Sequence, residues 1–324
     1  MEDLLRYDCD TVYSQQETAG WFDKIASPLY NQAMDSFITI YSYQSPVDNL
    51  HYNMVAKISV ADGSVEYLTS GEFQVYRIIS YDEANHLVTF VATVPENPIE
   101  SETLTVSDTP GSTPRCLTCG ANDPSSGQPC KFNVAVPSPD GKHFVHFCNG
   151  PKRSGGSVRA RKDFQPVLSS PDSTPKQEEY PVLYDRFPLP DGFTAYTKML
   201  LPTNYDELSS YPVIVETYGG PGFQQVYTDN GDSWERGLVE THGLIYIFID
   251  GRGTGFQSNE HMFQMFHGLG TVEIQDQIGV IQQLADKYAF LDMEQAGIWG
   301  WSYGGYATAM TMATDLTNVY KCGE

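Results

Sequence analysis

Short runs of β-forming residues recur along the first half of the chain. These runs occupy 37–41, 54–60, 65–68, 75–79, 87–94 and 143–147, and they are rich in β-branched and aromatic residues. Polar turns such as Asp62-Gly63 and Asp140-Gly141 separate them. This pattern predicts a series of short β-strands.

Three of the predicted strands begin in a similar way. Each follows a tight polar turn, at Asp35-Ser36-Phe37, Ala84-Asn85-His86-Leu87 and Asp140-Gly141-Lys142-His143. Repetition at this spacing is compatible with the blades of a β-propeller. A β-sandwich would produce a similar series of strands, so the pattern alone leaves both architectures open.

The pattern changes after a Ser/Pro-rich stretch at 166–176, which we interpret as a linker or a long surface loop. Apolar, strand-like runs follow at 213–215, 244–249 and 296–299. Helices are predicted between and after them at 234–241 and 306–314, and around Ile274, Ile278, Ile281 and Ala285, which share one helical face. Apolar strands that alternate with helices indicate a parallel sheet covered on both faces.

The chain therefore divides into two predicted domains. Its 324 residues are long enough for about two domains. We assign residues 1–165 to a β-rich domain and residues 166–324 to the beginning of an α/β domain.

The charge and the hydropathy pattern exclude several classes of partner. Lys and Arg number 19 and Asp and Glu number 41, which gives a net charge of −22. Such a charge disfavours binding to nucleic acid or to an anionic membrane. The sequence has no apolar run long enough to span a bilayer, and its first residues do not resemble a signal peptide. Either the protein is cytosolic or the true N-terminus is missing.

Four of the six cysteines lie close together in a loop rich in Gly, Pro, Ser and Asp. Cys116 and Cys119 form a CxxC pair, and Cys130 and Cys148 follow. A zinc site would favour a second CxxC or a histidine pair, and a thioredoxin-like redox pair would need a strand–helix context. Two local disulfides, Cys116–Cys119 and Cys130–Cys148, fit the spacing better and imply an oxidising compartment. We expect no metal.

The strongest chemical signal is a G-x-S-x-G motif at 300–304, between a predicted strand and a predicted helix. Glycines at this spacing allow the sharp turn that raises a serine hydroxyl above a sheet. Ser302 is therefore the candidate nucleophile, and the backbone N–H of Tyr303 points to a developing oxyanion. Trp301 and Tyr306 are candidates for the substrate pocket. In the alternative interpretation, Ser302 has a structural role only and caps the following helix.

Two further glycine-rich loops follow apolar strands. In the loop at 217–222, Tyr218 is a second candidate oxyanion donor, through its phenol or its backbone. The alternative is a Gly-Pro turn with a core tyrosine. In the loop at 250–255, Asp250 and Arg252 are predicted to hold a loop near the active site rather than to bind phosphate, because no G-K-[ST] follows.

Together these motifs resemble the dipeptidyl peptidase IV family of serine peptidases, in the prolyl oligopeptidase group. The similarity covers 297–306, 250–253, 218–221 and 269–277, and it is fainter around the four clustered cysteines. It implies a β-propeller joined to an α/β-hydrolase domain. Residues 1–165 would then be the C-terminal part of the propeller, and residues 166–324 the N-terminal part of the hydrolase domain. The similarity also implies release of N-terminal dipeptides, usually after proline or alanine, without a cofactor. Ser302 would attack, and the Tyr218 hydroxyl and the Tyr303 N–H would bind the oxyanion.

The resemblance has further implications for the whole protein. Members of the family are commonly type II membrane or secreted glycoproteins, so we expect an extracellular or cell-surface location, although this chain carries no anchor. A homodimer is expected for the full-length form, and peptides are the expected substrates.

The chain also departs from the family pattern. In α/β-hydrolases the triad runs Ser, Asp, His along the chain, but all seven histidines precede Ser302. Asp315 lies too close to Ser302 to be the triad acid, and Cys9 and Cys322 have no evident partners. We therefore interpret the chain as incomplete at both ends. We expect it to fold poorly and to be inactive alone, which a soluble, active, monodisperse preparation would refute.

Three functions remain in competition for the parent molecule. The first is a serine dipeptidyl peptidase, supported by a downstream Asp and His. The second is a non-catalytic, propeller-based binding protein, supported by a genuine stop after Glu324. The third is a general α/β-hydrolase such as an esterase, against which the propeller-like half and the Tyr218 loop argue.

Overall fold

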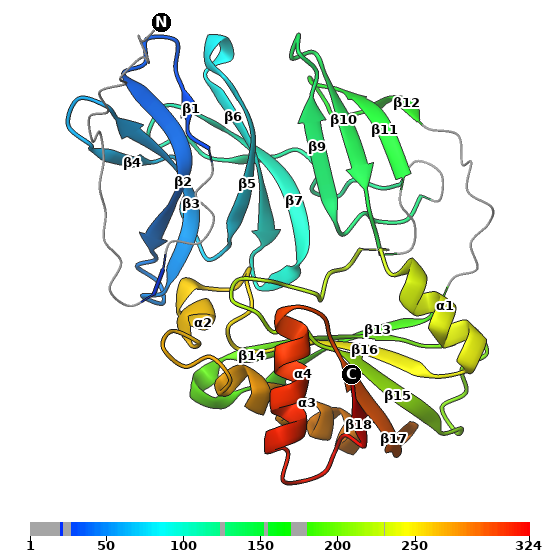
Figure 1. Cartoon of the computed structure of the whole chain (residues 1–324). Coiled ribbons are helices and arrows are strands. Elements are labelled where there is room, and N and C mark those ends of the chain that lie inside the picture. Colours follow the sequence, from blue (N-terminus) through cyan, green and yellow to red (C-terminus); the bar gives the residue numbers. More distant parts are fainter. Residues whose placement is uncertain (1–19, 22–26, 124–126, 152–154, 170–179, 230) are drawn as a thin grey trace, which may run out of the picture.

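The computed structural model describes residues 20–21, 27–123, 127–151, 155–169, 180–229 and 231–324. Figure 1 shows two parts, with three small sheets above one larger sheet and its helices. Cys9 lies outside the described residues, so its pairing stays open. Every helix among the described residues is too short or too polar to span a lipid bilayer.

The first part consists of three four-stranded sheets formed by consecutive strands. The first contains β1 (Leu29–Tyr30), β2 (Ser36–Gln44), β3 (His51–Ser59) and β4 (Val65–Tyr67). The second contains β5 (Val75–Asp82), β6 (Leu87–Val94), β7 (Asn97–Ser107) and β8 (Arg115–Cys116). The third contains β9 (Asn133–Pro137), β10 (His143–Cys148), β11 (Gly155–Ala160) and β12 (Pro166–Ser169). All their pairings are antiparallel. Separate four-stranded sheets, each built from consecutive strands, are the blades of a partial β-propeller rather than the two sheets of a sandwich.

Alternating side chains hold neighbouring sheets together. On β6, Val88, Phe90 and Ala92 are fully buried and pack into a core shared with Met54 of β3 and Val75 of β5. Full burial of a Val, Phe or Met side chain contributes about 1.5–3 kcal/mol. The strand β7 was not predicted, because its buried positions include Ser101 and Thr103, whose polarity masks the alternation.

The second part is a six-stranded sheet in the order β13-β14-β16-β15-β17-β18. Its strands are β13 (Val182–Pro188), β14 (Thr194–Leu200), β15 (Tyr211–Glu216), β16 (Ile245–Asp250), β17 (Leu291–Trp299) and β18 (Cys322–Gly323). Its helices are α1 (Ser233–His242), α2 (Asn259–Phe263), α3 (Val272–Lys287) and α4 (Tyr303–Thr314), and short 3₁₀ turns lie at Glu83–Asn85 and Pro190–Gly192.

Both faces of this sheet are covered, as predicted. Every residue of β16 is buried. On one face, Ile245, Ile247 and Ile249 pack with Ile281 of α3. On the other face, Tyr246 and Phe248 pack with Val239 of α1. This arrangement explains the continuous apolar run at 244–249.

The three predicted strands of this sheet run parallel, as expected, but the sheet also contains two antiparallel strands that were not predicted. The strands β16, β15, β17 and β18 run parallel, whereas β13, β14 and β16 pair antiparallel. The sequence pattern before residue 211 did not reveal these antiparallel strands. A tight turn joins β13 to β14, so no helix alternates with them.

Two boundaries also differ from expectation. Residues 166–169 form β12 of the third sheet rather than a linker, and the rest of that stretch lies outside the described residues. The last helix begins at Tyr303 rather than Tyr306, because the glycines at 304 and 305 are tolerated in its first turn.

The predicted disulfides are confirmed. Cys116 pairs with Cys119, and Cys130 pairs with Cys148. Cys322 carries a free, exposed thiol.

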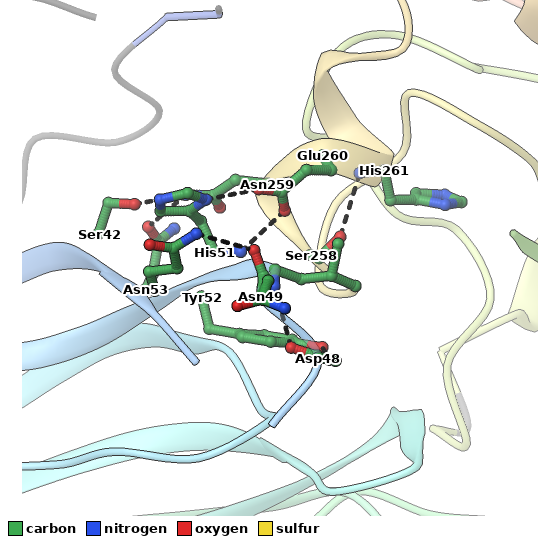
Figure 2. Close-up of polar contacts among 12 residues, drawn as sticks. Ser42, Asp48, Asn49, His51, Tyr52, Asn53, Ser258, Asn259, Glu260 and His261 are labelled. Atoms are coloured by element: carbon green, nitrogen blue, oxygen red, sulfur yellow. Dashed lines mark hydrogen bonds and ion pairs between the residues drawn. The ribbon is translucent and has the colours of Figure 1, made fainter. Parts of the chain in front are cut away.

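A polar network joins the first sheet to the short helix α2 (Figure 2). The carboxylate of Glu260 accepts from the backbone N–H of His51 at 2.8 Å and contacts its ring nitrogen Nδ1. The amide of Asn259 donates to the Ser42 hydroxyl at 3.0 Å. A second contact runs from Thr228 to the carbonyl of Ile99 on β7. The two parts are thus connected by satisfied polar groups at several points.

Candidate active site

Ser302 occupies a strained turn between β17 and α4. Its backbone has φ 57° and ψ −122°, a positive φ that a residue with a side chain rarely adopts. Such strain costs on the order of 1–3 kcal/mol and persists only where the surroundings enforce it. The side chain of Ser302 is exposed. The turn therefore presents a hydroxyl at the carboxyl end of the sheet, as the motif predicted.

Two glycines press this turn onto the end of β15. A Cβ on Gly300 would lie 2.3 Å from the carbonyl oxygen of Thr217, and a Cβ on Gly304 would lie 2.1 Å from the same atom. Both distances are far below contact, so only glycine fits at either position. The structure thus brings together the two loops that the sequence singled out separately.

Tyr218 lies beside the turn on the loop after β15. Its half-buried ring stands 4.3 Å from the ring of Phe223, 6.2 Å from Tyr303 and 6.5 Å from Trp301, measured between centroids. A Cβ on Gly220 would lie 2.4 Å from the Tyr218 ring. The tyrosine is therefore held against its own loop and faces the aromatic side chains around Ser302.

Tyr303 begins α4, so its backbone N–H has no acceptor within the helix. An N–H at this place, at the positive end of a helix, is suited to bind an oxyanion. The phenol of Tyr303 points elsewhere and donates to Glu273 at 2.8 Å. Burial and this carboxylate raise the pKa of Tyr303 well above its ordinary value.

Glu273 is a site residue that the sequence reasoning missed. It is 2% exposed, and its carboxylate also accepts from the backbone N–H groups of Gly270 and Thr271. Its position in the first turn of α3 was the available signal, because an acidic residue there can cap the helix. It ties α3 to the start of α4 and so fixes Tyr303.

The loop at 250–255 supports the Tyr218 loop. The buried carboxylate of Asp250 accepts from the backbone N–H of Gln225, at 3.0–3.1 Å, and of Val226, at 2.7 Å. The side chain of Gln225 in turn accepts from the backbone N–H of Tyr218 at 2.6 Å. Burial raises the pKa of Asp250 to about 7. This agrees with the structural role expected for Asp250.

Arg252 is engaged in a buried ion pair. Its guanidinium contacts the Asp276 carboxylate with Nη2–Oδ1 at 2.7 Å and Nε–Oδ2 at 3.0 Å, and its backbone N–H donates to the same carboxylate. Both residues are at most 5% exposed. With its charge fully paired, Arg252 is suited to holding the loop rather than to binding a phosphate.

The remaining candidates lie at the rim of this site. Trp301 is 67% exposed and Tyr306 is 41% exposed, with the Tyr306 ring 5.3 Å from that of Tyr303. Their assignment to a substrate pocket stays a prediction. Asp315 caps the end of α4 and accepts from the backbone of Thr317 and Val319. Its carboxylate is engaged by these backbone groups, at the opposite end of the helix from Ser302.

The seven histidines all lie among the described residues, so their hydrogen-bond partners can be compared with the position of Ser302. Four histidines are engaged elsewhere: His51 with Glu260, His86 with Asp108, His146 with Asn133, and His261 with the carbonyl of Gly251. Among the residues that the structure describes, no histidine forms a hydrogen bond with Ser302. Burial lowers the pKa of His261 to about 4, which keeps that ring neutral.

Comparisons with known proteins place these features in context. Residues 230–324 match the prolyl oligopeptidase family, and residues 4–154 match the N-terminal region of dipeptidyl peptidase IV. The chain is 31% identical to venom dipeptidyl peptidase 4 of Vespa velutina over 79% of this chain and 33% of the relative. It is 28% identical to the venom dipeptidyl peptidase 4 of Apis mellifera over 99% and 42%, respectively.

A solved structure supports the fold. The dipeptidyl peptidase 4 of Porphyromonas gingivalis superposes with a TM-score of 0.76 at 21% identity, over 91% of this chain and 40% of that chain. At that identity the likeness concerns the fold alone. The chain spans between a third and about two fifths of the curated relatives named above.

Proposed function

Because the chain belongs to the dipeptidyl peptidase IV family, we propose that it carries the nucleophile and the oxyanion-binding groups of a serine peptidase. The reaction is the release of N-terminal dipeptides from peptides, after proline or alanine. The observation that carries the proposal is the positive φ of the exposed Ser302 at the start of α4. A serine that only capped a helix would have no need of this strain.

The geometry supports a specific division of labour. The Ser302 Oγ attacks the scissile carbonyl, and negative charge develops on the carbonyl oxygen. The backbone N–H of Tyr303 and the hydroxyl of Tyr218 donate to that oxygen. Donors of this kind are each worth about 10²–10³ in kcat. Glu273 and Gln225 position the two tyrosines, since one binds the phenol of Tyr303 and the other the backbone of Tyr218.

The proposal assigns no general base within residues 1–324. Among the residues that the structure describes, no histidine is hydrogen-bonded to Ser302. A serine without its base loses roughly 10⁴–10⁶ in rate. We therefore expect residues 1–324 alone to show no measurable turnover.

Location and assembly follow as proposals of the same kind. Two disulfides support an oxidising, extracellular or cell-surface location. A homodimer rests on family membership alone.

The test is release of a chromophore from a Gly-Pro conjugate. It is measured for residues 1–324 and for any longer product of the same gene, each with Ser302→Ala. Ser209→Ala, on a distant exposed turn, is the matched control. We expect no turnover from 1–324, and turnover in a longer product that S302A abolishes and S209A preserves. A folded longer product without activity would support the non-catalytic binding protein instead.

A further inference from the structure

A carboxyl group lies beside the disulfide of the CxxC pair. One oxygen of Glu102, on β7, lies within 4.8 Å of both the Cys116 and Cys119 sulfurs, and the two sulfurs lie within the same distance of each other. Glu102 and Cys116 are half-buried, and Cys119 is exposed. One end of the disulfide is thus open to solvent, while an acid lies close to both sulfurs.

The second disulfide has neither feature. Cys130 is 4% exposed and Cys148 is 2% exposed. In the part of the chain that the structure describes, no carboxylate or imidazole forms a comparable trio with them. The molecule therefore holds an internal control for the chemistry of the first disulfide.

The two sulfurs of the exposed disulfide are also unequal. The backbone N–H of Cys119 donates to the Cys116 sulfur at 3.0 Å. A donor in this position stabilises a thiolate on Cys116, which makes Cys116 the better leaving group. An attacking thiolate reaches the exposed Cys119 sulfur more readily.

The surroundings of Glu102 bring its pKa close to neutral pH. Burial and the neighbouring carboxylate of Glu100 raise its pKa to about 7. Bonds from the Thr118 hydroxyl and the Asn133 amide, and the charge of Lys131, act in the opposite direction. Tyr76 on β5 is a further titratable group whose pKa the charge of Glu102 raises.

We propose that Cys116–Cys119 is a thiol–disulfide exchange site in which Glu102 supplies the proton to the departing Cys116 sulfur. A thiolate of an external dithiol attacks the Cys119 sulfur, the S–S bond breaks, and Cys116 leaves with the electron pair. The Glu102 proton moves to Cys116, directly or through one water. The second thiol of the reductant then displaces Cys119 as a thiol and closes the reductant's own disulfide, and Glu102 regains a proton from solvent.

The first test compares the two disulfides within the folded protein. The protein is treated with dithiothreitol, quenched with an alkylating reagent, and analysed by mass spectrometry at intervals, while circular dichroism monitors the fold. Cys116 and Cys119 are expected to become alkylated at least about tenfold faster than Cys130 and Cys148. Equal rates with the fold intact would overturn the proposal.

The second test isolates the carboxyl group. The rate of reduction of Cys116–Cys119 is measured for wild type and Glu102→Gln at each pH, so that ionisation of the reagent cancels in the ratio. Below pH 7 Glu102 holds a proton to give, and above pH 7 it does not. The ratio of wild type to E102Q is expected to be about fivefold to tenfold at pH 6 and to approach one at pH 8.5.

The matched control is Glu100→Gln, which removes a carboxylate from the same strand. Glu100 pairs with Lys131 and is not part of the trio. In a protein that carries E100Q, the effect of E102Q on the reduction rate should therefore keep its pH dependence, with the midpoint at slightly lower pH because Glu100 no longer raises the pKa of Glu102. A ratio for E102Q that does not change with pH would contradict the role of Glu102. Neither test depends on Ser302, so failure here leaves the peptidase proposal untouched.

Discussion

Two glycine-rich loops at the same edge of the sheet serve opposite purposes. The loop at 300–305 leaves Ser302 exposed, with a strained backbone and without a hydrogen-bonded histidine. In the loop at 250–255, Asp250 and Arg252 are buried. Asp250 accepts from a backbone N–H, and Arg252 pairs with Asp276. Because β16 and β17 both flank β15, the two loops support the same Tyr218 loop from either side.

The difference teaches how a reactive group is held. Glycine-rich sequence alone does not distinguish the loops, since both need glycine for close packing. They differ in whether their polar groups are satisfied. The loop at 250–255, whose buried charges are paired, stabilises the fold. The strained turn that exposes the Ser302 hydroxyl destabilises it. Changes to the two loops should therefore move stability in opposite directions.

The largest expected effect comes from breaking the buried ion pair. Asp276→Ala leaves the Arg252 guanidinium buried without a partner, which should lower the free energy of unfolding by about 3–5 kcal/mol. Urea denaturation measures this loss. The double variant Arg252→Met/Asp276→Leu removes both charges and should recover most of it. If D276A alone were neutral, the loop at 250–255 would not be the stabilising one.

A comparable effect, confined to a pH window, is the pH dependence set by Asp250. Its folded-state pKa of about 7 lies above the ordinary 3.8, so the folded state binds the extra proton, and stability falls as pH rises from the ordinary pKa through 7. Asp250→Asn should remove this fall, on the order of 4 kcal/mol. The measurement is the free energy of unfolding of both proteins from pH 4 to 8.

The buried His261 makes stability depend on pH in the opposite direction. Its pKa of about 4 lies below 6.5, so it contributes stability that is complete above pH 6.5 and lost as pH falls through 4. Stability of D250N should therefore rise more steeply between pH 4 and 6.5 than that of wild type. Parallel curves for the two proteins would exclude Asp250 as the source.

The smallest expected effect has the opposite sign. Ser302→Gly relieves the positive φ and should raise the free energy of unfolding by about 1 kcal/mol, since the relief of strain outweighs the backbone entropy of glycine. Gly253→Ala is the contrasting change, because its Cβ would lie 1.8 Å from the Met265 sulfur, and it should destabilise. Thermal denaturation compares the two. A destabilised S302G would mean that the turn is not strained.

Much of this comparison could be predicted from the sequence. The G-x-S-x-G motif between strand and helix located Ser302, and the apolar run at 244–249 located the loop after it, because both signals are local. The spacing of the cysteines also predicted both disulfides correctly. Local patterns sufficed where one segment determines its own conformation.

Contacts between distant segments could not be predicted. Glu273 binds Tyr303 across 30 positions of sequence, and Arg252 binds Asp276 across 24. The antiparallel β13 and β14 were missed because no helix alternates with them, and β7 because its buried side chains include polar ones. Such features depend on tertiary packing, which overrides local propensity.

The most direct test of the account is covalent labelling of the nucleophile. A form of the protein that turns over the Gly-Pro conjugate is treated with a phosphonate ester of a proline-containing dipeptide mimic, and the modified peptide is identified by mass spectrometry. The account predicts one label per chain on Ser302, absent from Ser302→Ala, with loss of turnover in proportion to labelling. A label on any other serine, or full inhibition with Ser302 unmodified, would contradict it.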